Sequence, residues 1–218
     1  MNRIGVTREE LGLTRAEYAQ LKSLSSPWKI QDFISRIPTN FEPDGDTYLS
    51  VQQVLRQRRA HCIEAAMVAA TALWINGEAP IMMDIRAIRD DDHVITLYRR
   101  DGCWGAISKT NNCTLRFRDP VYRTLRELAL SYFHEYSNDD REKTMREYSR
   151  AFDLSRIDPE LWVTNKGDCY DIVEMLDEIR HYKLFSPVQA RKLRRLERVE
   201  MRARTVKQFV NPYTRGSG

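Results

Sequence analysis

One segment of the chain constrains its fold more than any other. Residues 62–75, with the sequence CIEAAMVAATALWI, are apolar on nearly every side of a helix. A surface helix would carry one apolar stripe and one polar face, so this pattern predicts a central helix that is buried on most sides. Asn76-Gly77 ends it, because glycine commonly follows the last helical turn. The stretch is interrupted by Glu64 and is too short to cross a bilayer, so no membrane contact is expected.

The segments before this helix read as short helices and one loop. Two of them begin with a threonine that precedes a glutamate by three residues, the pattern of a capping box. The capping boxes lie at Thr7 to Glu10 and Thr14 to Glu17, further helices are predicted over residues 28–36 and 51–57, and a loop is predicted at 38–46.

After the central helix the sequence alternates as strands do and then becomes helical. Strands are predicted over residues 81–88, 93–99, 103–108 and 114–118, and helices over 121–136, 142–150, 170–182 and 188–209. This order predicts an α+β fold, with a buried helix packed on a small antiparallel sheet and helices on both flanks. The expected parts are an N-terminal helical lead at 1–27, a core at 28–120 and a helical extension at 121–218.

Charge is concentrated at the C-terminal end. The whole chain carries 35 Lys and Arg against 31 Asp and Glu, a net charge of +4. Residues 183–218 hold ten basic and two acidic side chains, which is +8, so the rest of the chain sums to −4. We expect the last helix to pack its apolar face on the domain or on a second copy, forming a homodimer. Nucleic acid is not expected as a partner, because no aromatic residues alternate with the arginines.

The cysteines and the N-terminus narrow the class of protein further. The four cysteines form no CxxC pair, and no histidine lies at zinc-ligand spacing from them. No metal, cofactor or disulfide framework is therefore expected. Residues 1–10 are polar and of mixed charge, unlike a secretory signal peptide, which predicts a cytoplasmic location.

The dipeptide Asp101-Gly102 is the strongest hairpin signal in the chain. A two-residue turn there sets the register of the two strands around it and places Ile95 opposite Ser108. Side chains alternate along each strand, so His93 and Ser108 share one face. They are diagonal neighbours, with Ser108 within reach of the His93 ring.

Cys62 begins the buried helix, where unpaired backbone amides and the helix dipole favour an anion and lower the pKa of a thiol. Its neighbour His61 is expected to pack or to cap the helix. A cysteine at the start of an Ala-rich helix, then His93 opening a hairpin, then a strand with Trp104, resembles the transglutaminase-like branch of the papain-like cysteine enzymes. The resemblance covers roughly residues 28–118. The runs HCIEAA, DDDHV and WGAISKTN are similar to bacterial proteins of this kind.

The resemblance implies a papain-like core in which Cys62 is the nucleophile and His93 the general base. It implies a peptide or protein substrate and an amide hydrolase or acyl transferase that acts through a Cys thioester. The family carries Asp where this chain has Ser108, and a hydroxyl orients an imidazole without stabilising its positive charge. The acidic residues 90–92 would partly compensate for that charge. A catalytically inert module that keeps the groove for protein binding is the alternative function.

Further residues are candidates for supporting roles. Asn111 or Asn112 would orient the His93 ring if Ser108 does not. The backbone N–H of Cys62 is one oxyanion donor, and the side chains considered for the second are Gln57, Gln53 and Tyr48. Trp104 is expected to pack near the site and to form one wall of the substrate cleft.

Overall fold

The protein is described by a computed structural model over residues 5–213. Within these residues the α-helices are α1 (Arg8–Leu11), α2 (Arg15–Ser23), α3 (Pro27–Arg36), α4 (Val51–Gln57), α5 (Cys62–Ile75), α6 (Leu125–Phe133), α7 (Tyr170–Glu178), α8 (Pro187–Ala190) and α9 (Arg198–Thr205). The short 3₁₀ helices are η1 (Leu154–Arg156) and η2 (Pro159–Leu161). The strands are β1 (Ile81–Ala87), β2 (His93–Arg100), β3 (Cys103–Ile107), β4 (Arg118–Tyr122), β5 (Met145–Ser149), β6 (Phe152–Asp153) and β7 (His181–Lys183).

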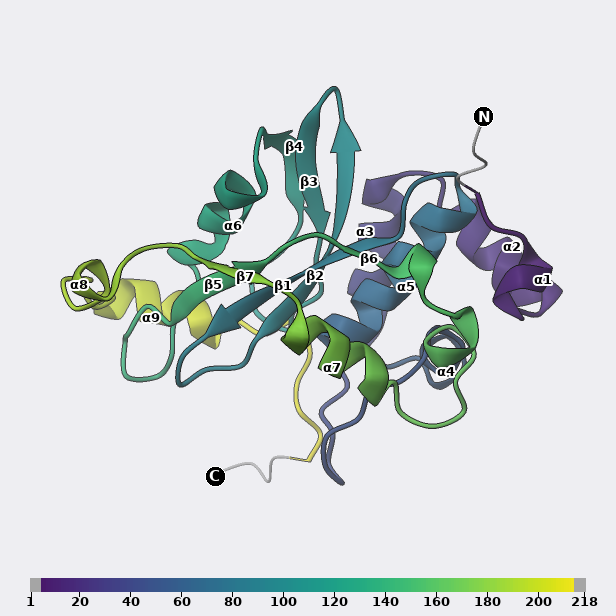
Figure 1. The fold of residues 1–218 in the computed structure, drawn as a ribbon. Coiled ribbons are helices and arrows are strands. Elements are labelled where there is room, and N and C mark those ends of the chain that lie inside the picture. Colours follow the sequence, from purple (N-terminus) through teal and green to yellow (C-terminus); the bar gives the residue numbers. More distant parts are fainter. Residues whose placement is uncertain (1–4, 214–218) are drawn as a thin grey trace.

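The strands form one antiparallel sheet in the order β4-β3-β2-β1-β5-β7, and β6 also pairs with β1. Helices lie on both faces of this sheet, with α3 and α5 beside one face and α6 beside the other (Figure 1). Val94 and Tyr98 of β2 pack in the cluster around α5, whereas Ile95 and Leu97 pack in the cluster around α6. The predicted α+β class is confirmed.

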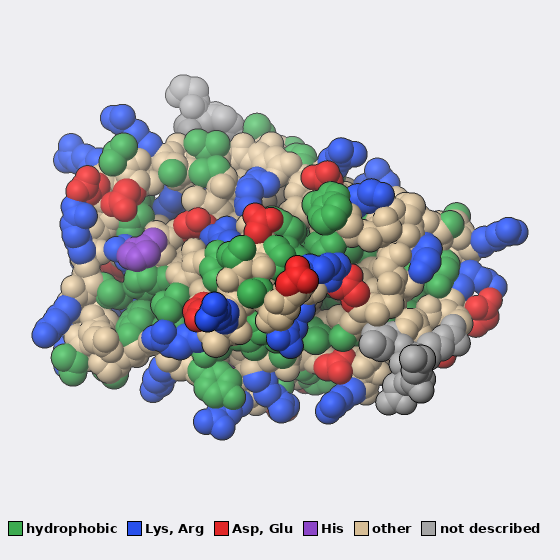
Figure 2. All heavy atoms as spheres, turned by 90° about the horizontal axis from the view of Figure 1, so that it is seen from above, with side chains coloured by type: hydrophobic (Ala, Val, Ile, Leu, Met, Phe, Trp, Pro, Cys, Tyr) green, Lys and Arg blue, Asp and Glu red, His purple; other side chains and the backbone are tan. Residues whose placement is uncertain are grey.

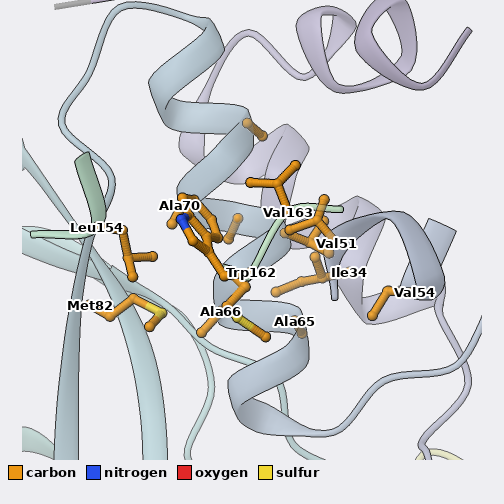
Figure 3. Close-up of a cluster of buried hydrophobic side chains, with 14 of the residues drawn as sticks. Ile34, Val51, Val54, Ala65, Ala66, Ala70, Met82, Leu154, Trp162 and Val163 are labelled. Carbon is orange, nitrogen blue, oxygen red and sulfur yellow. The ribbon is translucent and has the colours of Figure 1, made fainter. Parts of the chain in front are cut away.

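The central helix α5 occupies the bounds predicted for it, Cys62–Ile75. Every residue from Ile63 to Leu73 is buried. Figure 3 shows Ala66 and Ala70 on α5 among larger side chains from other elements, including Ile34 and Trp162. The small alanine side chains let these neighbours approach the helix closely, so α5 is covered from several directions and its first turn is held in a fixed place.

The hairpin between β2 and β3 also follows the sequence prediction. Asp101 and Gly102 have φ values of 49° and 80°, the left-handed pair that a tight hairpin turn requires. Thr96 pairs with Ile107, as the predicted register demands. One further step along both strands brings Ser108 opposite Ile95, on the face that carries His93.

Beyond the hairpin the structure departs from the predicted elements. The strand predicted over residues 114–118 is wrong, because Leu115 adopts a left-handed φ of 58° that does not fit a strand. β4 begins only at Arg118 and therefore occupies the start of the helix predicted over 121–136. That helix, α6, begins after Thr124, whose side chain forms a capping box.

Residues 121–218 are not the purely helical extension that we expected. The helix predicted over residues 142–150 is wrong: this segment contains β5, which pairs with the free edge of β1. The helix predicted over 170–182 ends at Glu178, and β7 follows it beside β5. Pairing with an available strand edge outweighs the helix preference of the charged side chains in these segments.

The predicted helix at 188–209 is divided into α8 and α9, separated by a non-helical stretch. Leu196 in that stretch is buried, whereas Val199 and Val206 are 63% and 56% exposed. The continuous apolar face is therefore broken, and a homodimer through these helices stays a prediction. Lys and Arg side chains are scattered among Asp and Glu over the face seen in Figure 2. Across residues 5–213, no helix is both long enough and apolar enough to cross a bilayer.

Candidate functional site

The candidate site lies at the first turn of α5. Cys62 is the first helical residue and His61 is the residue that caps it. The carboxylate of Glu64 accepts the backbone N–H of His61 at 2.8 Å, which is half of a capping box. This local pattern positions both the thiol and the neighbouring imidazole at the helix start.

Glu64 is fully buried beneath the site. Its carboxylate also accepts the backbone N–H of Leu49 at 2.9 Å and the side-chain amide of Asn40 at 3.1 Å. Burial raises the pKa of Glu64, and these donors together with the nearby His61 oppose that shift. A carboxylate inside an otherwise apolar helix is therefore held in place by named partners, and the interruption of the apolar run by Glu64 is the sequence signal for it.

His61 contributes more than a cap. Its Nε2 donates to the backbone carbonyl of Thr47 at 2.7 Å and lies 3.4 Å from the Glu64 carboxylate. Burial lowers the pKa of His61, but its hydrogen bond to Cys62 and the negative charges of Cys62 and Glu64 outweigh burial and raise the pKa to about 10. His61 is therefore a cation at neutral pH. Its capping position was expected, but its contact with the thiol was not.

His93 opens β2 and is buried, with its Nε2 2.8 Å from the hydroxyl of Ser108. The Ser108 hydroxyl donates its single proton to the carbonyl of Leu115 at 2.5 Å. Ser108 must then accept from His93, which places the ring proton on Nε2 and leaves Nδ1 as the acceptor. The predicted contact between Ser108 and His93 is thus present, and it selects one tautomer of the imidazole.

A glutamine from α3 holds Ser108 in place. The side chain of Gln31 accepts the backbone N–H of Ser108 at 2.9 Å and donates to its carbonyl at 2.8 Å. These two hydrogen bonds of the side-chain amide resemble those that a neighbouring strand would make at the point where β3 ends. Gln31 was not among the predicted site residues, and no local motif points to it because it is far from Ser108 in sequence.

The thiol of Cys62 is strongly acidic. Burial raises its pKa, but hydrogen bonds with His61 and His93 and the positive charge of these rings lower it to about 5. Cys169, which is buried without such partners, has its pKa raised to about 12 by burial and nearby carboxylates. The contrast between the two thiols arises from the imidazoles, because burial raises the pKa of each thiol and only Cys62 has imidazole partners that lower it.

Two hollows meet at Cys62. The lysine hollow, about 190 Å³, is lined by Cys62 and His93 together with Thr39, Lys109, Tyr136 and Ser137, among others. The aspartate hollow, about 420 Å³, is lined by Cys62 together with Tyr48, Asp84, Val94, Leu176 and Asp177, among others. A nucleophile between two hollows has room for a substrate group on either side of the bond that it attacks.

Asn111 and Asn112 do not orient His93. The side chain of Asn111 accepts the backbone N–H of Phe209 at 2.8 Å and donates to its carbonyl at 3.0 Å. Asn112 accepts from the side chain of Lys207. Both asparagines bind the segment that follows α9, and Ser108 contacts His93, so the condition under which one of them would orient the ring is not met.

Of the three side chains considered as oxyanion donors, Tyr48 adjoins the site. Its ring packs edge-to-face against His61, with centroids 5.8 Å apart, and it lines the aspartate hollow. Gln53 caps α4 through Ser50, and Gln57 is exposed at the end of the same helix. Neither glutamine lines either hollow.

Trp104 does not form a wall of the cleft. It lies near the turn of the hairpin, opposite Tyr122, and the guanidinium of Arg99 covers its ring at 4.9 Å. It lines neither of the two hollows, so the prediction for it is wrong. The distance along β3 explains this result, because Trp104 precedes Ser108 by four residues, or about 13 Å of extended chain.

The acidic residues before His93 hold the loop between β1 and β2. Asp90 accepts the hydroxyl of Thr144 at 2.6 Å, and Asp92 accepts a backbone N–H of β1 at 2.8 Å. The carbonyl of Asp91 accepts the hydroxyl of Tyr136. Burial raises the pKa values of Asp90 and Asp92. Each contact fixes the approach of the chain to His93.

Three carboxylates, those of Asp84, Asp92 and Asp177, bring oxygen atoms within 4.8 Å of one another beside the aspartate hollow. Arg86 lies 3.5 Å from Asp84 and 3.0 Å from Asp177, and His181 lies 3.0 Å from Asp84. The guanidinium of Arg86 already provides a positive partner to this cluster, so we assign no cation to it.

Comparison of the chain with known protein families and with curated proteins finds no match. The atoms of the site themselves indicate its chemistry. They comprise an acidic thiol at a helix start, one cationic imidazole beside it, and a second imidazole whose tautomer is set by a serine.

Proposed function

We propose that the protein is a cysteine-dependent hydrolase or acyl transferase of the transglutaminase-like kind, acting on an amide bond of a peptide or protein. One observation carries the proposal. Cys62 stands at a helix start, has a pKa of about 5 through His61 and His93, and opens onto two hollows. Strongly perturbed thiols in a cleft are typical of nucleophiles.

In the proposed reaction the Cys62 thiolate attacks the carbonyl carbon of the amide. The backbone N–H of Cys62 and the hydroxyl of Tyr48 are the candidate donors to the oxyanion. His93, whose Nδ1 took the proton of the Cys62 thiol when the thiolate formed, gives that proton to the leaving nitrogen. The C–N bond breaks, and a thioester and a free amine result. Water or a second amine then loses a proton to His93 and attacks the thioester. The products are a carboxylic acid or a new amide, and the thiolate is regenerated.

A catalytically inert binding module is the second candidate, and the neutral Ser108 favours it. A carboxylate at this position would stabilise the imidazolium of His93 during the reaction, whereas the hydroxyl supplies no charge. The two functions differ in one measurable step, since only the enzyme needs to form and release a thioester.

The test begins with the reactivity of the thiols. Iodoacetamide at about pH 6, followed by mass mapping, should label Cys62 at least 100-fold faster than the exposed Cys113, because an ordinary thiol is almost fully protonated there. Incubation with p-nitrophenyl acetate should then acetylate Cys62 and release p-nitrophenol over repeated turnovers.

Two matched variants serve as controls. Cys62→Ala should lose both signals and Cys113→Ala should keep them. Fast labelling without repeated turnover would select the binding module, and labelling of Cys62 no faster than that of Cys113 would exclude both the acidic thiol and the enzyme.

A further inference from the structure

The lysine hollow contains an unusual cation. Lys109 is 4% exposed, and its Nζ donates to the carbonyl of Ile37 at 2.7 Å. Among residues 5–213 no carboxylate lies within 4.0 Å of this ammonium, and the nearest ring, that of Phe209, is 5.2 Å away. An ammonium has three donors, so two N–H groups of Lys109 have no acceptor among residues 5–213.

Ser137 and Thr39 line the same hollow and carry hydroxyls without a partner among the described residues. Ser137 is 5% exposed, and its Oγ has no hydrogen-bond partner among the described residues. The buried Oγ1 of Thr39 has none either. Buried polar atoms are nearly always paired in folded proteins, so two unpaired hydroxyls and a lysine without a carboxylate partner, all on residues that line one hollow, indicate a missing polar ligand.

Three of the four acidic side chains that line this hollow are already engaged, and the fourth, Asp91, is exposed. Glu135 forms an ion pair with Arg118 at 2.6 Å, and Asp90 accepts from Thr144. Asp92 accepts a backbone N–H of β1. None of these carboxylates pairs with Lys109, whose positive charge is therefore free to act on a ligand. Burial and the nearby Arg116 lower the pKa of Lys109 to about 8, so it remains charged below that pH.

We propose that the lysine hollow binds a carboxylate of the substrate close to the carbon that Cys62 attacks, through Lys109, Ser137 and Thr39. This inference rests on the proposed function, because it takes Cys62 as the nucleophile. A carboxylate offers acceptors to an ammonium and to two hydroxyls at once. The substrate class is then an amide with an adjacent acidic group, such as a free C-terminal carboxylate or an acidic side chain.

The test compares two alkylating agents that differ in charge. In both, the Cys62 thiolate displaces iodide from a CH₂ group and forms a thioether. Iodoacetate carries a carboxylate beside that carbon, and iodoacetamide carries a neutral amide. The ratio of their rate constants at about pH 6.5 therefore reports the charge that the hollow presents, and Lys109→Met should lower this ratio about tenfold.

Matched variants separate the contributions. Lys109→Arg keeps the charge and should retain most of the ratio, and Lys143→Met, which removes a lysine outside this hollow, should leave it unchanged. Ser137→Ala removes only a hydroxyl and should lower the ratio about twofold. Sodium acetate should slow alkylation of the wild-type protein and not that of Lys109→Met. Thermal melting of each variant identifies any that fails to fold, and Ser137→Ala with acetate protection then decides the outcome.

An unchanged ratio in folded Lys109→Met, together with no protection by acetate, would overturn the inference. In that case rapid labelling of Cys62 by iodoacetamide would still stand, and the proposed function with it. Slow labelling of Cys62 by both agents would instead overturn the proposed function.

Discussion

The two imidazoles beside Cys62 differ in what holds them. His93 belongs to the sheet, and its Nε2 is hydrogen-bonded to the neutral hydroxyl of Ser108. His61 belongs to the start of α5. Its Nε2 lies near the buried carboxylate of Glu64 and donates to the backbone carbonyl of Thr47. One ring has a neutral partner that sets its tautomer, and the other has a charged partner that keeps it protonated.

This difference indicates a division of roles. His61, with a pKa of about 10, keeps a positive charge over the neutral range and stabilises the thiolate without exchanging its proton. His93, with Nδ1 as its acceptor, is the ring suited to take and return a proton. The carboxylate missing from the third position is then replaced in part by Glu64, which acts through His61 and not through His93.

The largest effect that we expect is a difference in turnover rate between variants of His93 and variants of His61. His93→Gln should reduce repeated turnover of p-nitrophenyl acetate by about 10² to 10⁴, the usual contribution of a general acid–base. His61→Gln should reduce it less once the pH is high enough to ionise the thiol. Steady-state rates measured from about pH 5 to about pH 10 check this. His134→Gln, on an exposed histidine, is the control, and equal losses in the two site variants would refute the division of roles.

The second prediction concerns the pH midpoint of Cys62 alkylation. In the wild-type protein the thiolate forms at a pKa of about 5. Removal of a cation disfavours an anion, so His61→Gln should raise the midpoint by about two units and slow labelling at about pH 6 by roughly tenfold. At about pH 9 the rates of variant and wild type should converge. A midpoint that stays near its wild-type value would show that His93 alone acidifies the thiol.

The third prediction tests the buried carboxylate. Glu64→Gln removes the negative charge beside His61, so the pKa of His61 should fall. The pH midpoint of Cys62 alkylation should then rise by about one unit. The amide also presents an NH₂ group to backbone donors, which should cost about 1 to 3 kcal/mol in the free energy of unfolding. Urea unfolding and pH-dependent alkylation measure the two effects. Glu174→Gln, on an exposed face of α7, should change neither.

The parts of this site that follow from the sequence are those set by local structure. The two-residue turn at Asp101-Gly102 determines the register, and the register brings Ser108 to His93. The start of α5 at Cys62 follows from the apolar run and from the glutamate in its first turn. Each depends on residues only a few positions apart, where spacing alone is informative.

The parts that could not be predicted depend on partners far along the chain. Gln31 pairs with Ser108 across 77 positions, and Asn111 is bound by Phe209 across 98. β5 forms because β1 has a free edge, although its own sequence favours a helix. Side-chain contacts such as that of His61 with Cys62 are also invisible to a spacing argument, since neighbouring residues on a helix normally point apart.

The smallest expected effect concerns Ser108 itself, and it tests which of the two imidazoles stabilises the Cys62 thiolate. Ser108→Asp supplies a carboxylate to His93, but it removes the donor to the Leu115 carbonyl and brings two oxygens together. His61 already stabilises the thiolate, so the midpoint of Cys62 should fall by less than about one unit. Ser108→Ala should change labelling at about pH 6 by no more than about twofold and affect turnover more, because the tautomer of His93 is then no longer set. A large change in the pH midpoint of Cys62 labelling in either variant would show that His93, and not His61, mainly stabilises the thiolate.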